Sequence, residues 1–271
     1  MQYPLSYIHE EVRTILDQNQ EEGTILSDEA NTLKLDEIIR QKILHAARHL
    51  LETSDVSVID GKTCYIHKAG DPNWPDPEPD GLIVNLWEDG DTSWGELSAW
   101  VMEMPEDYLR LLSLKMSDWK RGVHATIPYE SADYSQLRSG FIGITGNPER
   151  PAVAEIKIGR DHHHISEESS VGAGETGWEL ENLRGLEIYT SATGDVVDFR
   201  YCPIPAYETR NTAPSGQTPV YVDYLDFPEK LFRMLLYQTG SLVAAAYKDA
   251  GLAQLLMNMV YEGEPESKEE Q

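Results

Sequence analysis

The sequence predicts an α+β fold, in which helices from both ends of the chain form one helical bundle and the middle region is β-rich and sandwich- or barrel-like. Two observations predict this order. Apolar residues recur at helical spacing over 35–51 and again over 228–260, whereas short patterns of period two occur only between these segments. The length of 271 residues is enough for one large domain or two small ones, each with its own core.

The N-terminal part, 1–54, is expected to contain two helices. Pro4 precedes apolar residues at nearly helical spacing: Leu5, Ile8, Val12, Ile15 and Leu16. Residues 17–32 are polar and include Gly23, which predicts a loop. The strongest helical signal follows as one continuous apolar stripe: Leu35, Ile38, Ile39, Ile43, Ala46, Ala47, Leu50 and Leu51.

The middle region, 55–225, is expected to be rich in short strands with loop insertions. The candidate strands are 55–67, 82–88, 97–104, 109–119, 151–158, 186–190 and 196–201. Clusters of proline, glycine and aspartate separate them. The densest cluster is 71–81, where successive X-Pro steps exclude regular structure.

The C-terminal part, 226–262, is expected to complete the bundle. Asp226-Phe227-Pro228 begins a predicted helix whose apolar positions are Leu231, Leu235, Leu242, Val243 and Ala246. A second predicted helix has its apolar positions at Ala253, Leu256, Met257 and Val260. The acidic tail, 263–271, lacks apolar side chains and therefore has no core of its own.

Composition excludes several classes of function. Asp and Glu number 47 against 22 Lys and Arg, so the formal net charge is −25, which disfavours binding to duplex DNA or an anionic membrane. No apolar run approaches the roughly 20 residues that span a bilayer, and the N-terminus has no signal-peptide pattern. The only two cysteines, Cys64 and Cys202, are expected to be reduced and buried.

Three features keep a second class of function open: a soluble metal-dependent enzyme, or a sugar-binding β-domain with helical flanks. His45 and His49 lie one helical turn apart, but Ala46 stands where a zinc protease has its general base. The triplet 162–164 is all histidine, but it lies in a polar, glycine-flanked stretch and is expected to be dispensable. Four tryptophans fall in one β-rich zone, where burial is commoner than sugar binding: Trp74, Trp87, Trp94 and Trp100. No catalytic residue, cofactor or metal site is therefore assigned.

The most informative stretch is 103–123, which reads EMPEDYLRLLSLKMSDWKRGV. Pro105 and the two acids after it predict a turn, and the mostly apolar run to Met116 predicts a strand buried on at least one face. This stretch resembles the central signature of tailed-phage head-to-tail adaptor (connector) proteins. The signature residues are Pro105, Asp107, Leu109, Arg110 and Trp119, followed downstream by Pro148, Arg150 and Pro151.

Other segments are similar to the same family and occur in the same order. They are the opening 7–17 with Ser27-Asp28-Glu29, the loops 131–134 and 143–148 with Arg150-Pro151, the segments 186–189 and 201–205, and the closing helix 237–249. Residues 67–98 and 161–178 depart from the family pattern and have the character of insertions.

The resemblance implies a virion structural protein without enzymatic activity, made in the host cytoplasm and placed at the head–tail junction. It implies a dodecameric ring that binds the portal protein on one side and the next tail or ring protein on the other. Double-stranded DNA would pass through the ring during genome ejection without specific binding, which suits an acidic channel wall. Partner contacts are expected in segments that lack a core, at Trp74, Tyr261 and Glu264.

Overall fold

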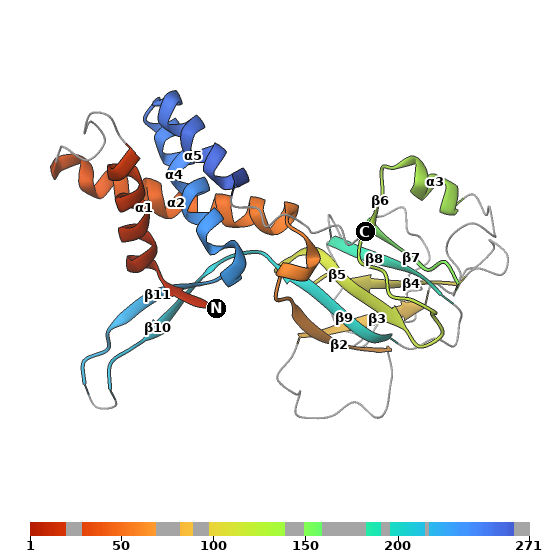
Figure 1. Ribbon diagram of the computed structural model, residues 1–271. Coiled ribbons are helices and arrows are strands. Elements are labelled where there is room, and N and C mark those ends of the chain that lie inside the picture. Colours follow the sequence, from red (N-terminus) through yellow and green to blue (C-terminus); the bar gives the residue numbers. More distant parts are fainter. Residues whose placement is uncertain are drawn as a thin grey trace, which may run out of the picture. The chain divides into compact units, whose positions relative to one another are not determined.

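The computed structural model describes residues 1–19, 29–68, 82–88, 98–138, 149–158, 183–190, 196–214 and 217–262 (Figure 1). The chain divides into two compact units. One, here called the helical unit, combines Met1–Asp60 with Ile204–Gln271, and the other, the sheet unit, is Gly61–Pro203. Helices and strands both occur, so the predicted α+β class is confirmed.

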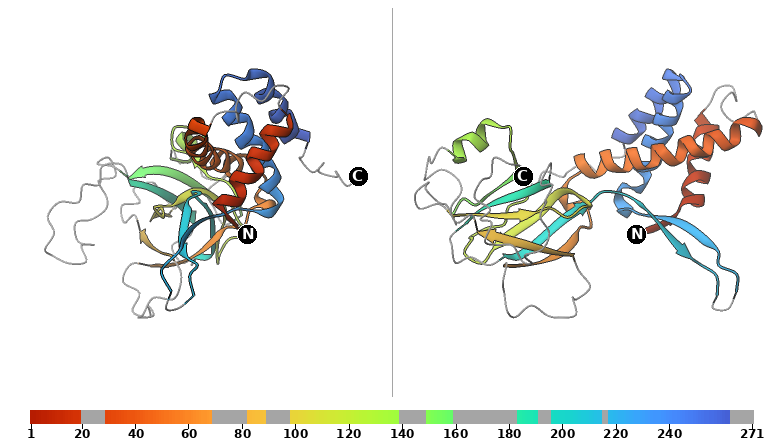
Figure 2. Two further views of the ribbon diagram at one scale, coloured as in Figure 1. Left: turned by 90° about the vertical axis from the view of Figure 1, so that its left-hand side faces the viewer. Right: turned by 180° about the vertical axis from the view of Figure 1, so that it is seen from behind.

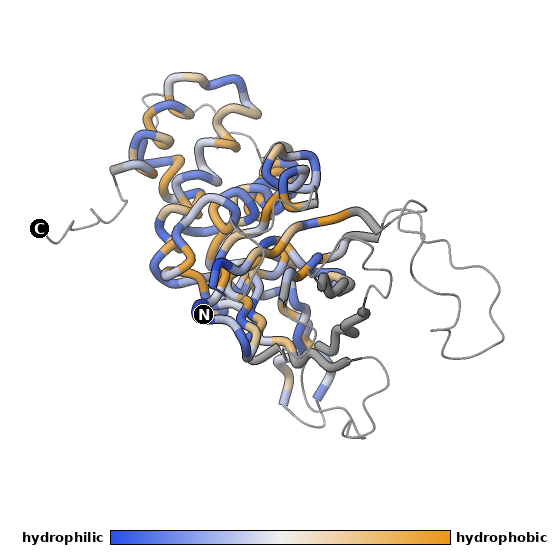
Figure 3. The backbone as a smooth tube through the Cα atoms, turned by 90° about the vertical axis from the view of Figure 1, so that its right-hand side faces the viewer, coloured by the Kyte–Doolittle hydropathy of each residue, from blue (hydrophilic) through white to orange (hydrophobic). Residues whose placement is uncertain are grey.

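The helical unit contains residues from both ends of the chain. Its elements are β1 (Gln2–Pro4), α1 (Leu5–Asn19), α2 (Glu29–Thr53), the 3₁₀ turn η1 (Val56–Val58), β10 (Tyr207–Asn211), β11 (Tyr221–Asp226), α4 (Glu229–Ala246) and α5 (Ala250–Glu262). Helix α4 contacts α1, α2 and α5, so one C-terminal helix packs on both N-terminal helices. Figure 3 shows apolar and polar stretches alternating along the helices, as expected when each helix buries one face.

The apolar stripes predicted from the sequence form the core of the helical unit. The fully buried residues include Ile8, Val12, Leu16, Ile39, Ile43, Ala46, Ala47, Leu235, Val243, Ala244 and Leu256. Gly240 lets α5 approach α4 closely, because a Cβ there would lie 3.1 Å from Leu256 Cδ1. Between these two helices Lys248 adopts a left-handed φ of 63°, and the Asp249 carboxylate accepts the Leu252 amide at 3.0 Å as the cap of α5.

The sheet unit contains an eight-stranded open sheet in the order β5-β9-β2-β3-β4-β8-β7-β6. The strands are β2 (Lys62–Lys68), β3 (Leu82–Glu88), β4 (Ser98–Glu103), β5 (Tyr108–Met116), β6 (Ile127–Pro128), β7 (Ala152–Ile158), β8 (Leu183–Thr190) and β9 (Val196–Pro203), with helix α3 (Ala132–Arg138) between β6 and β7. All the strand pairs are antiparallel except β2–β3 and β6–β7. One core cluster of this unit includes Tyr108, Leu111, Leu114, Trp119, Phe199 and Tyr201.

The prediction of a barrel-like middle region was wrong for the described sheet. The outer strands of the described sheet are β5 and β6, and they do not pair with each other. Strand β6 is two residues long and contains Pro128, which has no amide to continue a hydrogen-bond ladder. The sheet therefore stays open at this end.

Seven strands were predicted close to their observed positions, whereas β1, β6, β10, β11 and α3 were not predicted. The predicted strand 55–67 begins instead as η1, and the predicted loop 17–32 overlaps the ends of α1 and α2. The predicted middle region 55–225 also differs from the sheet unit, because β11 pairs with β1 and with β10 in the helical unit. Residues 204–225 therefore belong with the helices.

Candidate interaction surfaces

The hairpin formed by β10 and β11 extends beyond the helices of its unit (Figures 1 and 2). Its strands are antiparallel, with Thr209 opposite Asp223, and the second side of β11 pairs with β1. The sheet order is therefore β1-β11-β10, which makes β10 an outer strand. Towards the tip Val220 and Tyr221 are 54% and 68% exposed, so the hairpin presents apolar surface to solvent.

The base of the hairpin is fixed to α2 through Arg40. The Arg40 guanidinium forms an ion pair with Asp223 Oδ2 at 2.9 Å and lies over the Tyr207 ring, 5.0 Å from its centroid. The Tyr207 hydroxyl in turn donates to the Arg40 carbonyl at 2.6 Å, and Thr209 Oγ1 donates to Asp223 Oδ1 at 2.6 Å. Burial raises the pKa of Tyr207, which keeps this hydroxyl a neutral donor. The contacts hold the hairpin base in one position on α2.

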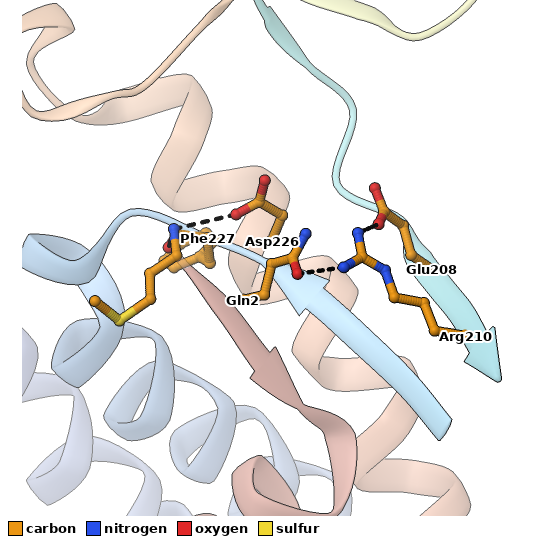
Figure 4. Close-up of polar contacts among 6 residues, drawn as sticks. Gln2, Glu208, Arg210, Asp226 and Phe227 are labelled. Carbon is orange, nitrogen blue, oxygen red and sulfur yellow. Dashed lines mark hydrogen bonds and ion pairs between the residues drawn. The ribbon is translucent and has the colours of Figure 1, made fainter. Parts of the chain in front are cut away.

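A second polar group ties the N-terminus into the same sheet (Figure 4). The Met1 ammonium donates to Asp226 Oδ1 and to the Phe227 carbonyl, both at 3.1 Å. One guanidinium nitrogen of Arg210 donates to Gln2 Oε1 at 2.5 Å, across β11 in β1. The other donates to Glu208 Oε2 at 2.5 Å, in the same strand as Arg210. These groups are exposed, so they orient the strands more than they stabilise them.

The outer half of the hairpin differs in charge from the rest of the chain. No Asp or Glu occurs from Thr209 to Val222, and this stretch contains Arg210, whereas the whole chain carries 47 acidic residues. A second acidic surface can therefore approach this stretch with less repulsion than elsewhere.

Two of the residues on which the family resemblance rests, Pro105 and Asp107, lie just before β5 in the sheet unit. Pro105 is buried and its carbonyl accepts the Tyr108 amide at 2.9 Å, which closes the turn that leads into the strand. Asp107 Oδ2 accepts Lys62 Nζ at 2.6 Å, and Asp107 Oδ1 accepts the Tyr201 hydroxyl at 2.7 Å. Asp107 therefore joins the start of β5 to both β2 and β9.

The pKa shifts in this group follow from burial and hydrogen bonding. Burial opposes ionisation of Asp107, but the hydrogen bonds from Lys62 and Tyr201 outweigh it and lower its pKa. Burial and then the Asp107 carboxylate raise the pKa of Tyr201. Burial raises the pKa of Cys64 and of Cys202 to about 11, so both thiols stay protonated and unreactive at neutral pH.

The other sequence-predicted residues are spread over several places. Leu109 and Trp119 are buried, Arg110 is partly exposed, and downstream Arg150 is exposed whereas Pro151 is buried. Among the expected partner contacts, Tyr261 is 64% exposed on α5. Pro148, Trp74 and Glu264 lie outside the described residues. The signature residues near Asp107 therefore lie at the start of β5 or are buried in it.

The histidine pair on α2 is not arranged as a metal site. His45 is exposed, and His49 Nδ1 is paired with Gln238 Nε2 of α4 at 2.9 Å. In the part of the chain that the structure describes, no three His, Cys, Asp or Glu side chains come together as metal ligands. The triplet 162–164 lies outside that part. None of the described helices is both long and apolar enough to cross a bilayer.

No known family model matches the sequence, and no curated protein is significantly similar to it.

The hairpin is the surface that the sequence interpretation missed. Tyr221-Val222-Asp223-Tyr224-Leu225 contains residues that favour strands but does not alternate with period two, and Pro214 and Pro219 precede it. This signal is weak because only Leu225 of these five residues is buried.

Proposed function

We propose that this protein is a head-to-tail adaptor of a tailed phage, a virion structural subunit that forms a ring on the portal and extends the DNA channel towards the tail. The observation that carries the proposal is the 103–123 stretch, together with the other similar segments that follow the family order along the chain. Such a protein would perform no catalysis and would need no cofactor. Its activity would consist of binding to its own copies, to the portal and to the next tail or ring protein.

The organisation of the helical unit supports the proposal. In the proposed arrangement α1, α2, α4 and α5 form the helical bundle of the adaptor, with the β-rich region inserted between its halves. Packing of α4 on both N-terminal helices is consistent with this arrangement. The insertion of the sheet unit between α2 and β10 leaves the ends of the chain in one compact unit.

The charge of the chain suits a DNA channel. A lysine- or arginine-rich wall would exchange counterions with the phosphates and retain the DNA, whereas acidic residues repel it. At a net charge of −25, each subunit can line a channel through which DNA slides without binding.

The test is assembly on the portal ring encoded by the same genome. The chain should sediment with that portal, and negative-stain images should show an added ring of twelve-fold symmetry. Tyr261→Ser should weaken this co-sedimentation, because Tyr261 is 64% exposed at the end of α5. Leu255→Ser is the matched control, since Leu255 is 43% exposed on the same helix and is not an expected contact.

A chain that stays monomeric beside its portal at every salt concentration would overturn the proposal. Stoichiometric binding of zinc or a glycan by that monomer would then favour a metal-dependent enzyme or a sugar-binding domain.

A further inference from the structure

The outer edge of β10 has the geometry of an unpaired strand within the described sheet. The Thr212 amide donates to the Val220 carbonyl at 2.8 Å, so the backbone groups of Thr212 face β11. Because successive residues of a strand face opposite sides, those of Arg210 and Glu208 also face β11. The amides and carbonyls of Tyr207, Thr209 and Asn211 then face outward.

An independent hydrogen bond gives the same alternation. The Phe227 amide donates to the Met1 carbonyl at 2.9 Å, so the backbone groups of Phe227 face β1. Because the backbone groups alternate along β11, those of Leu225 and Asp223 also face β1, whereas those of Tyr224 and Val222 face β10. Tyr224 and Val222 are the residues opposite Glu208 and Arg210. The outward-facing groups of β10 therefore form a regular edge.

This edge is regular, because β10 pairs with β11 without a bulge, and its two charged residues, Glu208 and Arg210, are of opposite sign. No proline occurs within Tyr207–Asn211, and the four residues after Tyr207 are exposed. The opposite edge of the same sheet, β1, is three residues long and ends in Pro4, which has no amide to donate. A further strand would therefore add to β10 and not to β1.

The sequence of β10 is complementary to itself. In an antiparallel pair of two β10 strands centred on Thr209, Glu208 of each copy lies opposite Arg210 of the other. Thr209 then lies opposite Thr209, and Tyr207 opposite Asn211. The outward-facing residues become the hydrogen-bonded pairs, so Glu208 and Arg210 meet at the closer, non-hydrogen-bonded positions. Opposite charges and paired threonines at facing positions both stabilise a sheet.

We propose that β10 is a homodimerisation edge, through which two copies of this chain pair antiparallel about a two-fold axis at Thr209. The contact is the same on both copies, so it closes after two and cannot generate a ring. It is therefore distinct from the ring contacts of the proposed function, and we expect it in the protein that is not bound to the portal. Each copy contributes one acid and one base to the contact, Glu208 and Arg210, so the contact adds no net charge where two chains of net charge −25 meet.

Charge reversal tests the pairing directly, with sedimentation equilibrium of the full chain as the measurement. Arg210→Glu puts glutamate at both positions 208 and 210, and Glu208→Arg puts arginine at both. Each variant should dimerise at least about tenfold more weakly than wild type, because two attractive cross-strand pairs become repulsive. An equimolar mixture of the two variants should restore the dimer, since each glutamate then faces an arginine.

The controls separate this contact from general effects of charge. Lys120→Glu and Glu149→Arg change the net charge by the same amounts at an exposed ion pair of the sheet unit, and should leave dimerisation unchanged. Gln2→Ala removes the contact of Arg210 with β1 and should also leave it unchanged. Unchanged circular dichroism of each variant establishes that the hairpin variants are folded.

A wild-type chain that is monomeric at all concentrations would overturn the proposal. Single reversals that dimerise as well as wild type, or a mixture that stays monomeric, would also overturn it. Failure of the portal to recruit the chain would contradict the adaptor proposal but not this one.

Discussion

At the scale of single residues, Asp107 joins three strands of the sheet unit. Its carboxylate accepts hydrogen bonds from Lys62 at 2.6 Å and from Tyr201 at 2.7 Å. Asp107→Asn keeps the size but cannot satisfy both donors with a charged acceptor. We expect the free energy of unfolding of the sheet unit to fall by about 1 kcal/mol at pH 7. Tryptophan fluorescence in urea measures this unit alone, because all six tryptophans lie within Gly61–Pro203.

The same substitution should alter the pH dependence. The folded state lowers the pKa of Asp107, so the contribution of its carboxylate is present above the unfolded pKa of about 3.9. That contribution is lost as the pH falls through the lower folded pKa. The stability difference between wild type and Asp107→Asn should therefore shrink below about pH 4. Tyr201→Phe, which removes one donor and leaves the carboxylate, should retain most of the pH dependence.

Gly61 is a position at which the addition of a single Cβ atom should destabilise the sheet unit. A Cβ there would lie 2.2 Å from Leu112 Cδ1 and 2.8 Å from the Tyr201 carbonyl oxygen, which is backbone and cannot turn aside. Gly61→Ala should destabilise the sheet unit by about 2 kcal/mol in the same urea experiment. Gly122→Ala is the matched control, because its nearest contact is 3.5 Å and ordinary. Equal stability of the two variants would contradict this close approach.

At the scale of elements, Arg40 fixes the hairpin to α2. Arg40→Met keeps the aliphatic stem but removes the ion pair with Asp223 and the contact with the Tyr207 ring. Amide hydrogen exchange should become about fivefold faster in β10 and β11, while α4 and α5 remain unchanged. Arg48→Met is the control, since the Arg48 guanidinium pairs with Glu52 of the same helix. Faster exchange throughout the helical unit would mean that Arg40 supports the whole core and not the hairpin.

At the scale of the whole molecule, charge should control assembly. A dodecamer would carry about 300 formal negative charges, whose mutual repulsion interface burial and counterions must offset. Because salt screens this repulsion, we expect ring formation on the portal to be favoured at high salt concentration. At low salt concentration, and without the portal, we expect no closed ring. Sedimentation velocity at low and high salt, with and without portal, measures both. A stable ring at low salt from the chain alone would indicate a far more apolar interface than this composition predicts.

The sequence by itself determined the elements whose periodicity is strong. The apolar stripe from Leu35 to Leu51 predicted the core face of α2, and the run from Leu109 to Met116 predicted β5, because burial of one face imposes a repeat on the residues. The charge and the missing apolar spans likewise limited the classes of function from composition alone. Asp107 was identified through the resemblance, without any indication of its partners.

Only the tertiary structure decided which distant segments meet. Lys62 and Tyr201 reach Asp107 from positions 45 and 94 residues away in sequence, a distance over which local patterns carry no information. Strands β10 and β11 belong to the helical unit because they pair with β1 from the other end of the chain, although the sequence placed them in the middle region. The residues of β10 after Tyr207 are polar and exposed, and the apolar residues of β11 do not alternate with polar ones, so neither strand has an apolar repeat that would predict it.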